Sequence, residues 1–195
     1  MKRLLWIASL AIAALVLTGG PALASATTLQ SFASSSGANV VIGSDGTSAT
    51  ITLDPCTAPT GCKPYPNFGG VFINSKSQSG KLIGDPGLRF SFVSTGDVAG
   101  GAPRFSIPID TDGVGSTNNG YAFLDAAGCG GYTGGPNVTV STMSTTCGVF
   151  FDKPYTSWAD FATQHPTYRI GPGFIPFIIA DGTAGTYTVN SIALR

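Results

Sequence analysis

The sequence predicts an all-β protein, a two-sheet antiparallel β-sandwich of the jelly-roll kind with one short helix. About ten short segments have strand character and are separated by turn signals, a pattern typical of sandwiches and, less often, barrels. The 195-residue chain contains 27 Gly and 13 Pro, which supply those turns. Apolar residues make up 43% of the chain, too many for a disordered protein, and the absence of Glu argues against a helical bundle.

The N-terminus has the layout of a secretory signal peptide. Two basic residues are followed by an apolar run over residues 4–17 and an Ala-x-Ala site at residues 22–24, so we expect residues 1–24 to be removed. The apolar run is shorter than the roughly 20 residues of a membrane-spanning helix, which makes an uncleaved anchor the weaker interpretation. The protein is therefore predicted to be secreted, with the cell envelope as a further location, and without stable membrane insertion after cleavage.

The strand candidates follow a Ser-, Ala- and Thr-rich stretch at residues 25–36, which we expect to be a flexible arm. The single folded domain is then predicted to span residues 37–195. Several candidates alternate apolar and polar residues, as half-buried antiparallel strands do. Pro108 cannot donate a ladder hydrogen bond, so its strand is expected at a sheet edge or a bulge. The predicted strands are residues 38–42, 49–53, 70–74, 88–94, 104–110, 121–125, 138–143, 148–152, 168–170, 174–180 and 187–194.

One helix is predicted, at residues 157–164. Ser157 followed three residues later by Asp160 resembles a capping box, with Asp in place of the usual Glu or Gln. Pro166 ends the helical pattern.

The charge balance excludes two classes of partner. The chain has ten basic and ten acidic residues, and two of the basic residues lie in the predicted signal, so the exported chain would carry a net charge of −2. No basic run remains, so neither nucleic acid nor an anionic membrane surface is an expected partner.

Four Cys in an exported chain predict two disulfides, for which three pairings are possible. The local pairs Cys56–Cys62 and Cys129–Cys147 are favoured over the crossed pairs, because each brackets a short stretch with turn residues. A zinc site is the alternative. The four Cys residues lack the paired Cys-x-x-Cys spacing of such a site, and the single His, His165, is distant from them in sequence.

An Asp- and Asn-rich loop is the candidate metal site. Asp110, Asp112 and Asn118 follow one predicted strand, and Asp125 ends the next. Carboxylate and amide oxygens suit calcium, so the loop could hold a structural calcium ion. The loop differs from an EF-hand calcium loop, because Val114 occupies a position where an EF-hand has an oxygen ligand. The alternative is an ordinary hairpin loop, since Asp, Asn and Gly are the usual residues of tight turns.

Loop aromatics are the candidate ligand-binding residues, because sugar rings stack on aromatic faces. Tyr132 lies among glycines, Tyr65 follows the first Cys pair, and Trp158 stands at the helix entry. The alternative is that Trp158 packs on the core and Tyr65 covers the disulfide.

Catalytic constellations are sparse, and no catalytic residue is predicted. A nucleophilic triad would have to use His165, which sits beside Pro166 at the predicted helix end. A glycosidase-like carboxylate pair would need two Asp, for example Asp110 with Asp125.

Near the C-terminus, residues 180–194 contain an Asp-Gly turn followed by Thr-Tyr-Thr-Val-Asn-Ser-Ile-Ala-Leu at residues 186–194. This stretch resembles the closing hairpin of jelly-roll carbohydrate-binding modules and galactose-binding-like domains, with Asn190 where an Asp is usual. The resemblance implies the sandwich fold and carbohydrate binding, and it assigns no binding residue.

These observations together predict a secreted extracellular binding protein whose best candidate ligand is a carbohydrate, such as a cell-wall glycan or another extracellular polysaccharide. Two alternatives stay open: an envelope or surface structural protein without a small-molecule ligand, and a small Asp-dependent hydrolase.

Overall fold

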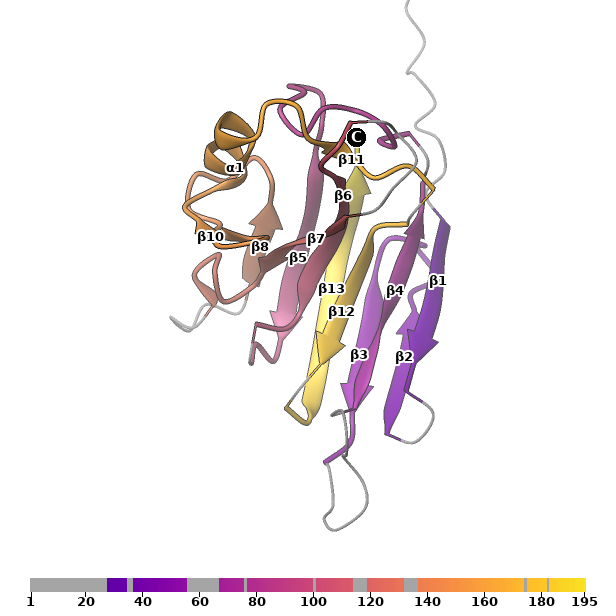
Figure 1. Ribbon diagram of the computed structural model, residues 1–195. Coiled ribbons are helices and arrows are strands. Elements are labelled where there is room, and N and C mark those ends of the chain that lie inside the picture. Colours follow the sequence, from indigo (N-terminus) through magenta and orange to yellow (C-terminus); the bar gives the residue numbers. More distant parts are fainter. Residues whose placement is uncertain are drawn as a thin grey trace, which may run out of the picture.

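The protein is an all-β sandwich of two antiparallel sheets, which confirms the predicted fold class (Figure 1). The computed structural model describes residues 28–34, 37–55, 67–75, 77–99, 101–113, 119–131, 137–173, 175–181 and 183–195, and the statements below concern these residues. The predicted signal peptide lies outside them. Among the helices of the described part, none has the length and apolar character needed to cross a membrane.

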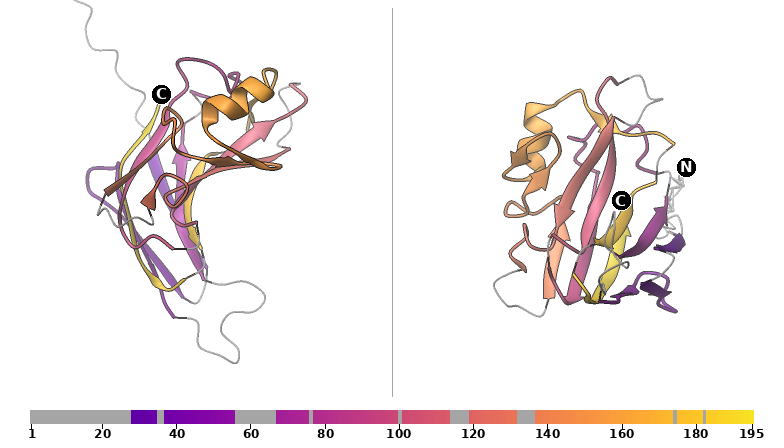
Figure 2. Two further views of the ribbon diagram at one scale, coloured as in Figure 1. Left: turned by 90° about the vertical axis from the view of Figure 1, so that its left-hand side faces the viewer. Right: turned by 60° about the horizontal axis from the view of Figure 1, so that its bottom comes forward.

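The larger sheet has eight strands and the smaller sheet has five. Both sheets are twisted, and the helix lies at one end of the sandwich (Figure 2). The larger sheet runs in the order β1 (Thr28–Ala33), β4 (Phe68–Asn74), β12 (Phe177–Asp181), β6 (Arg104–Asp110), β7 (Gly120–Asp125), β9 (Val149–Phe150) and β10 (Pro154–Tyr155), with β11 (Arg169–Ile170) also pairing with β6. The smaller sheet runs in the order β2 (Ala38–Ile42), β3 (Ala49–Leu53), β13 (Gly185–Leu194), β5 (Phe90–Gly96) and β8 (Asn137–Ser141).

Alternate residues of each strand enter the core between the sheets. Along β6, for example, Phe105, Ile107 and Ile109 are fully buried. Phe90 and Phe92 of β5 meet them from the smaller sheet, with the Phe92 and Phe105 ring centroids 5.0 Å apart. Each such side chain contributes about 1.5–3 kcal/mol by leaving water.

Strand β1 corrects the expectation of a flexible arm over residues 25–36. Thr28–Ala33 pairs along its whole length with β4, from Thr28 opposite Asn74 to Ala33 opposite Gly69. The polar composition of this stretch suggested disorder. An edge strand, however, needs only a few residues that face the core. Here Leu29 packs against the core, while the pairing with β4 supplies the backbone hydrogen bonds.

Strand β6 corrects the expectation that Pro108 marks an edge or a bulge. The strand is interior, between β12 and β7. On one side, however, β12 pairs only as far as Ser106, and β11 takes over at Ile109. Pro108 lies in this gap, where its missing N–H interrupts no ladder, and its carbonyl accepts a hydrogen bond from Gly171 at 2.8 Å.

The predicted helix is confirmed as α1 (Trp158–Gln164). Ser157 is its N-cap, and the Ser157 hydroxyl accepts a hydrogen bond from the Asp160 backbone N–H at 3.1 Å. An N-cap of this kind stabilises a short helix whose first N–H groups have no intrahelical partner.

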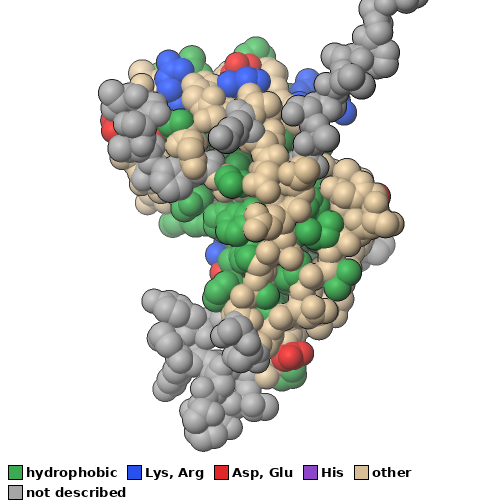
Figure 3. All heavy atoms as spheres, turned by 90° about the vertical axis from the view of Figure 1, so that its right-hand side faces the viewer, with side chains coloured by type: hydrophobic (Ala, Val, Ile, Leu, Met, Phe, Trp, Pro, Cys, Tyr) green, Lys and Arg blue, Asp and Glu red, His purple; other side chains and the backbone are tan. Residues whose placement is uncertain are grey.

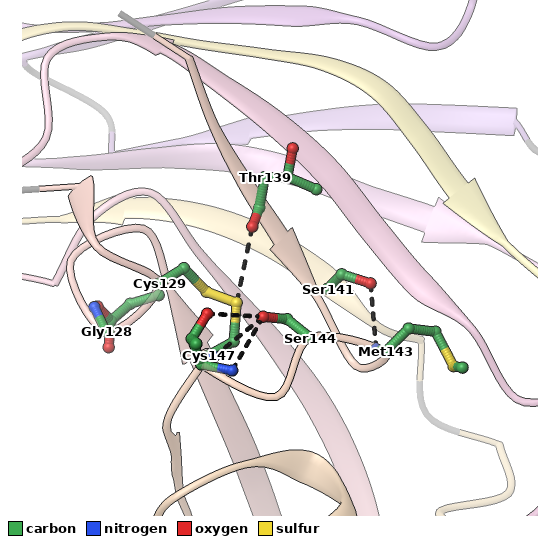
Figure 4. The surroundings of a disulfide bond; sticks show 9 residues. Gly128, Cys129, Thr139, Ser141, Met143, Ser144 and Cys147 are labelled. Carbon is green, nitrogen blue, oxygen red and sulfur yellow. Dashed lines mark hydrogen bonds between the residues drawn. A yellow bond between two sulfur atoms is a disulfide. The ribbon is translucent and has the colours of Figure 1, made fainter. Parts of the chain in front are cut away.

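The predicted disulfide Cys129–Cys147 is also confirmed (Figure 4). It joins the turn after β7 to the segment before β9. The Ser144 hydroxyl accepts a hydrogen bond from the Cys147 backbone N–H at 3.2 Å, which fixes the segment around the second Cys. The other predicted pair, Cys56 and Cys62, lies outside the described residues.

Candidate functional site

Four aromatic rings contact one another on the outer face of the larger sheet, and we call this set the aromatic row. Its members are Phe32 of β1, Phe72 of β4, Phe177 of β12 and Tyr121 of β7. Phe32, Phe72 and Phe177 form a triangle with ring centroids 4.5 Å, 5.8 Å and 5.8 Å apart, and Tyr121 lies 5.3 Å from Phe177. Strand alternation places Phe72 and Phe177 away from the core, because the residues on either side of each are buried, and Phe32 and Tyr121 contact these rings on the same face.

Strand pairing brings these rings together. Phe72 lies directly opposite Phe177 in the β4–β12 ladder. Phe32 lies opposite Gly70, and a Cβ added to Gly70 would lie only 2.5 Å from Phe32 Cζ. The missing side chain of Gly70 therefore gives the Phe32 ring room to lie over β4 beside Phe72.

The aromatic row is partly exposed. The centroids of Phe32 and Tyr121 lie 5.8 Å and 5.3 Å from the centroid of Phe177, so the row is at most about 11 Å long. All four rings are half-buried, and their planes are tilted against one another by 38° to 84°. Viewed from the β1 side, hydrophobic side chains gather in the middle of the molecule (Figure 3). A half-exposed aromatic surface on a sheet whose other face already forms the core is typical of an interaction site.

A charged pair lies on the same sheet as the aromatic row. Arg104 donates two hydrogen bonds to Asp181, each 2.6 Å long, in a bidentate pair whose side chains are 23% and 27% exposed. The Arg104 guanidinium also lies over the Phe123 ring, 5.1 Å from its centroid. Both contacts hold the guanidinium flat against the sheet. The remaining donor and acceptor capacity of the pair can bind polar groups of a ligand.

Ser106 lies between two outward rings, since Phe177 and Phe123 are its neighbours on the adjoining strands. Its side chain is fully buried, and its hydroxyl has no hydrogen-bond partner among the described residues. The small side chain leaves room for the rings to cover β6.

The predicted stacking residue Trp158 is a core residue, which corrects its assignment to a ligand. Its side chain is 5% exposed, and its Nε1–H donates to the backbone carbonyl of Ile83 at 2.8 Å. The ring also contacts Phe161 and Phe90, so it offers no free face to a sugar. The other two predicted stacking residues, Tyr65 and Tyr132, lie outside the described residues.

The predicted metal ligands are only partly brought together. Asp110 is buried, and its carboxylate accepts hydrogen bonds from the backbone N–H groups of Asp112 at 3.1 Å and Gly113 at 2.9 Å. Asn118 lies outside the described residues. In the described part of the chain, no three or more His, Cys or Asp side chains group as a metal site would require. Calcium binding at this loop stays a prediction.

Asp125 is far from that loop. It lies opposite Arg104, at the other end of the β6–β7 ladder from Asp110. The six-residue offset along β6 corresponds to about 20 Å. Carboxyl groups of glycosidases lie about 5–9.5 Å apart, so Asp110 and Asp125 do not form such a pair. Asp125 is also too distant to share an ion with Asp110, and its carboxylate instead accepts a hydrogen bond from the Gly128 backbone N–H.

The single His belongs to a hydrogen-bonded chain beside α1. The Tyr155 hydroxyl donates to Asp152 Oδ1 at 2.6 Å and accepts from His165 Nε2, also at 2.6 Å. The hydrogen bond from Tyr155 lowers the pKa of the Asp152 carboxyl, while burial and this same bond raise the pKa of the Tyr155 hydroxyl. A hydroxyl with a raised pKa keeps its proton at neutral pH. This chain therefore joins α1 to β10.

No family model matches this chain, and neither do any curated proteins or solved structures. The candidate site therefore depends on the geometry of this molecule. Sequence reasoning placed the candidate ligand-binding residues on loops, whereas the aromatic row lies on strands.

Proposed function

We propose that this protein is an extracellular binding protein and that the aromatic row binds a carbohydrate polymer. The observation that carries the proposal is the contact of four half-exposed rings from four different strands on the outer face of the larger sheet. The core does not require these rings, because the opposite face of the same strands fills it. Their exposure needs another explanation, and a ligand provides one.

The chemistry of the surface suits a sugar chain. The C–H faces of sugar rings pack against aromatic side chains, and sugar hydroxyls bond to charged and amide groups. The aromatic row supplies the first kind of contact, and the Arg104–Asp181 pair on the same sheet supplies the second. An aromatic surface with a few fixed polar groups is the usual composition of a small-molecule or glycan site.

The position of the row suits part of a polymer. The four rings form one stacking surface, at most about 11 Å long, on the outside of the larger sheet. A short stretch of a sugar chain can lie on it, each unit contributing a modest stacking energy. The confirmed disulfide is compatible with the predicted export, and a cell-wall glycan or another extracellular polysaccharide would be met there.

Retention on polysaccharides tests the proposal. Protein purified from cells expressing the full chain is applied to cellulose, chitin and peptidoglycan, and to soluble glucans by affinity electrophoresis. We expect binding to at least one of them, and an affinity about tenfold lower for Phe177→Ala, whose ring is the centre of the row. Thermal melts monitored by circular dichroism establish that the variant is folded at the assay temperature.

Val41→Ala is the matched control. Val41 is 56% exposed and lies on β2 of the smaller sheet, so its truncation removes exposed apolar surface away from the row. It should bind as the unmodified protein does. The proposal fails if the unmodified protein is retained on no polysaccharide, or if Phe177→Ala binds as well as Val41→Ala. The latter result is what the structural-protein alternative predicts.

A further inference from the structure

A second pair of aromatic side chains lies on the outer face of the larger sheet, beyond the aromatic row. Phe123 of β7 and Phe150 of β9 are directly opposite each other in the β7–β9 ladder. Ala122 and Leu124 are fully buried, so strand alternation turns the Phe123 ring between them outward. Val149 is 2% exposed whereas Phe150 is 51% exposed, so the Phe150 ring also points away from the core.

Strand register joins this pair to the aromatic row. Five residues oppose one another in successive ladders, and we call this set the register line. Its members, in order, are Phe72, Phe177, Ser106, Phe123 and Phe150. The line crosses β4, β12, β6, β7 and β9, which are consecutive strands, so four strand spacings give it a backbone length of about 19 Å.

A small residue occupies the middle of the register line, and a charged pair flanks it. The buried Ser106 side chain separates Phe177 from Phe123 without projecting between their rings. Arg104 lies two residues from Ser106 on the same face of β6, a step of about 7 Å. Its guanidinium contacts the Phe123 ring and is paired with Asp181. A ligand that passes from Phe177 to Phe123 can therefore bond its hydroxyls to this charged pair.

The dimensions of the register line suit a narrow, extended ligand. The line is about 19 Å long, and the next residues on the same face lie about 7 Å to either side, so the strip is about 14 Å wide. Such a strip covers on the order of 300 Å², well below the roughly 800 Å² that each partner contributes to a stable protein–protein interface. A second copy of this chain would therefore need much more surface. A single sugar chain has the shape of the strip, and its hydroxyls match the charged pair beside it.

We propose that Phe123 and Phe150 form a second stacking subsite, so that one extended, unbranched polysaccharide chain follows the register line from the aromatic row to β9. The inference rests on the proposed function, because the aromatic row holds the other part of the same chain. It adds the direction of the polymer, across the strands, and a minimum length. Phe177 and Phe150 are three strand spacings apart, about 14 Å of backbone, so a disaccharide is too short to reach both subsites, whereas a hexasaccharide is long enough.

Oligosaccharide length is the variable that tests the second subsite. Titration calorimetry compares cellobiose with cellohexaose, chitobiose with chitohexaose, and mannobiose with mannohexaose. We expect at least one hexasaccharide to bind the unmodified protein about tenfold or more tightly than its disaccharide. Phe150→Ala should bind that hexasaccharide about fivefold or more weakly and lose most of the gain with length, because it removes the stacking ring. Phe150→Tyr keeps the ring and should retain the affinity.

Met143→Ala is the matched control, because Met143 is 54% exposed and lies outside the register line. It should bind the hexasaccharide as the unmodified protein does, and circular dichroism melts establish that each variant is folded. If Phe150→Ala binds the hexasaccharide as tightly as Met143→Ala does, the second subsite is overturned. If Phe177→Ala still weakens binding in that case, the proposed function stands without it.

Two other outcomes also overturn the second subsite. One is that no hexasaccharide binds although a polysaccharide is retained, in which case the aromatic row alone accounts for the retention. The other is found by sedimentation velocity. If the unmodified protein is a dimer and Phe150→Ala is a monomer, the register line is an interface between two copies of this chain.

Discussion

Replacing Gly70 with Ala tests whether the aromatic row depends on the bare backbone beneath Phe32. An added Cβ would lie 2.5 Å from Phe32 Cζ and 3.0 Å from Phe32 Cε1, and it would press on the backbone carbonyl oxygen of Ile178. Phe32 could turn away, but only by leaving Phe72. The carbonyl of Ile178 cannot move without disturbing the ladder in which β12 pairs with β4.

The expected magnitude follows from these two contacts. Overpacking in a well-packed site costs about 1–3 kcal/mol, and the upper part of that range applies because one contact is with the backbone. Ala is favoured over Gly within a strand by about 0.5–1 kcal/mol, which offsets part of the cost. The free energy of unfolding should therefore fall by about 2 kcal/mol. For a chain of this length, that lowers the melting temperature by about 4–8 °C.

Differential scanning calorimetry measures the shift, and near-ultraviolet circular dichroism reports the loss of aromatic packing. Gly84→Ala is the control, because the only contact of its added Cβ would be the Ala162 Cβ at an ordinary 3.8 Å. Gly84→Ala should melt close to the unmodified protein. If Gly70→Ala melts at the same temperature as Gly84→Ala and keeps the near-ultraviolet spectrum, the role assigned to Gly70 is refuted.

Three further predictions concern stability. Replacing both Cys129 and Cys147 with Ala opens a loop with a sequence separation of 18 and should cost about 3 kcal/mol, measured by urea unfolding; no change would contradict it. Ser157→Ala removes the N-cap acceptor and should cost about 1 kcal/mol in the same assay, whereas Ser157→Asn should retain most of the stability. The lowered pKa of Asp152 stabilises the fold at neutral pH, and this contribution should disappear as the pH falls below about 3.8. Tyr155→Phe removes the bond that lowers this pKa, so its stability should fall less steeply on acidification; parallel pH profiles would contradict the assignment.

Much of the strand pattern could be predicted from the sequence, because alternation and turn residues act locally. The segment Leu-Arg-Phe-Ser-Phe at residues 88–92 alternates cleanly, and β5 begins within it at Phe90. Each predicted strand overlaps an observed one, and the helix and one disulfide were also predictable. Strand β1 was not, because it presents few apolar residues and owes its conformation to pairing with β4, which follows it by more than thirty residues. The sequence left open whether Trp158 lies on the surface or in the core, because a helix entry is compatible with either position, and the structure places it in the core.

Part of the aromatic row could be recognised from the sequence. Two of its rings stand in runs without alternation, Val-Phe-Ile at residues 71–73 and Phe-Ile-Ile at residues 177–179. In a two-sheet sandwich only one face of each strand meets the core, so such a run indicates that the outer face is apolar as well. The sequence does not indicate that these runs become neighbours, or that Phe32 joins them. That follows from the order β1, β4, β12, which is set by long-range pairing and by the register of each ladder. A one-residue slip of β12 against β4 would turn Phe177 into the core and interrupt the row, so the proposed binding face depends on the same register that buries Ile178.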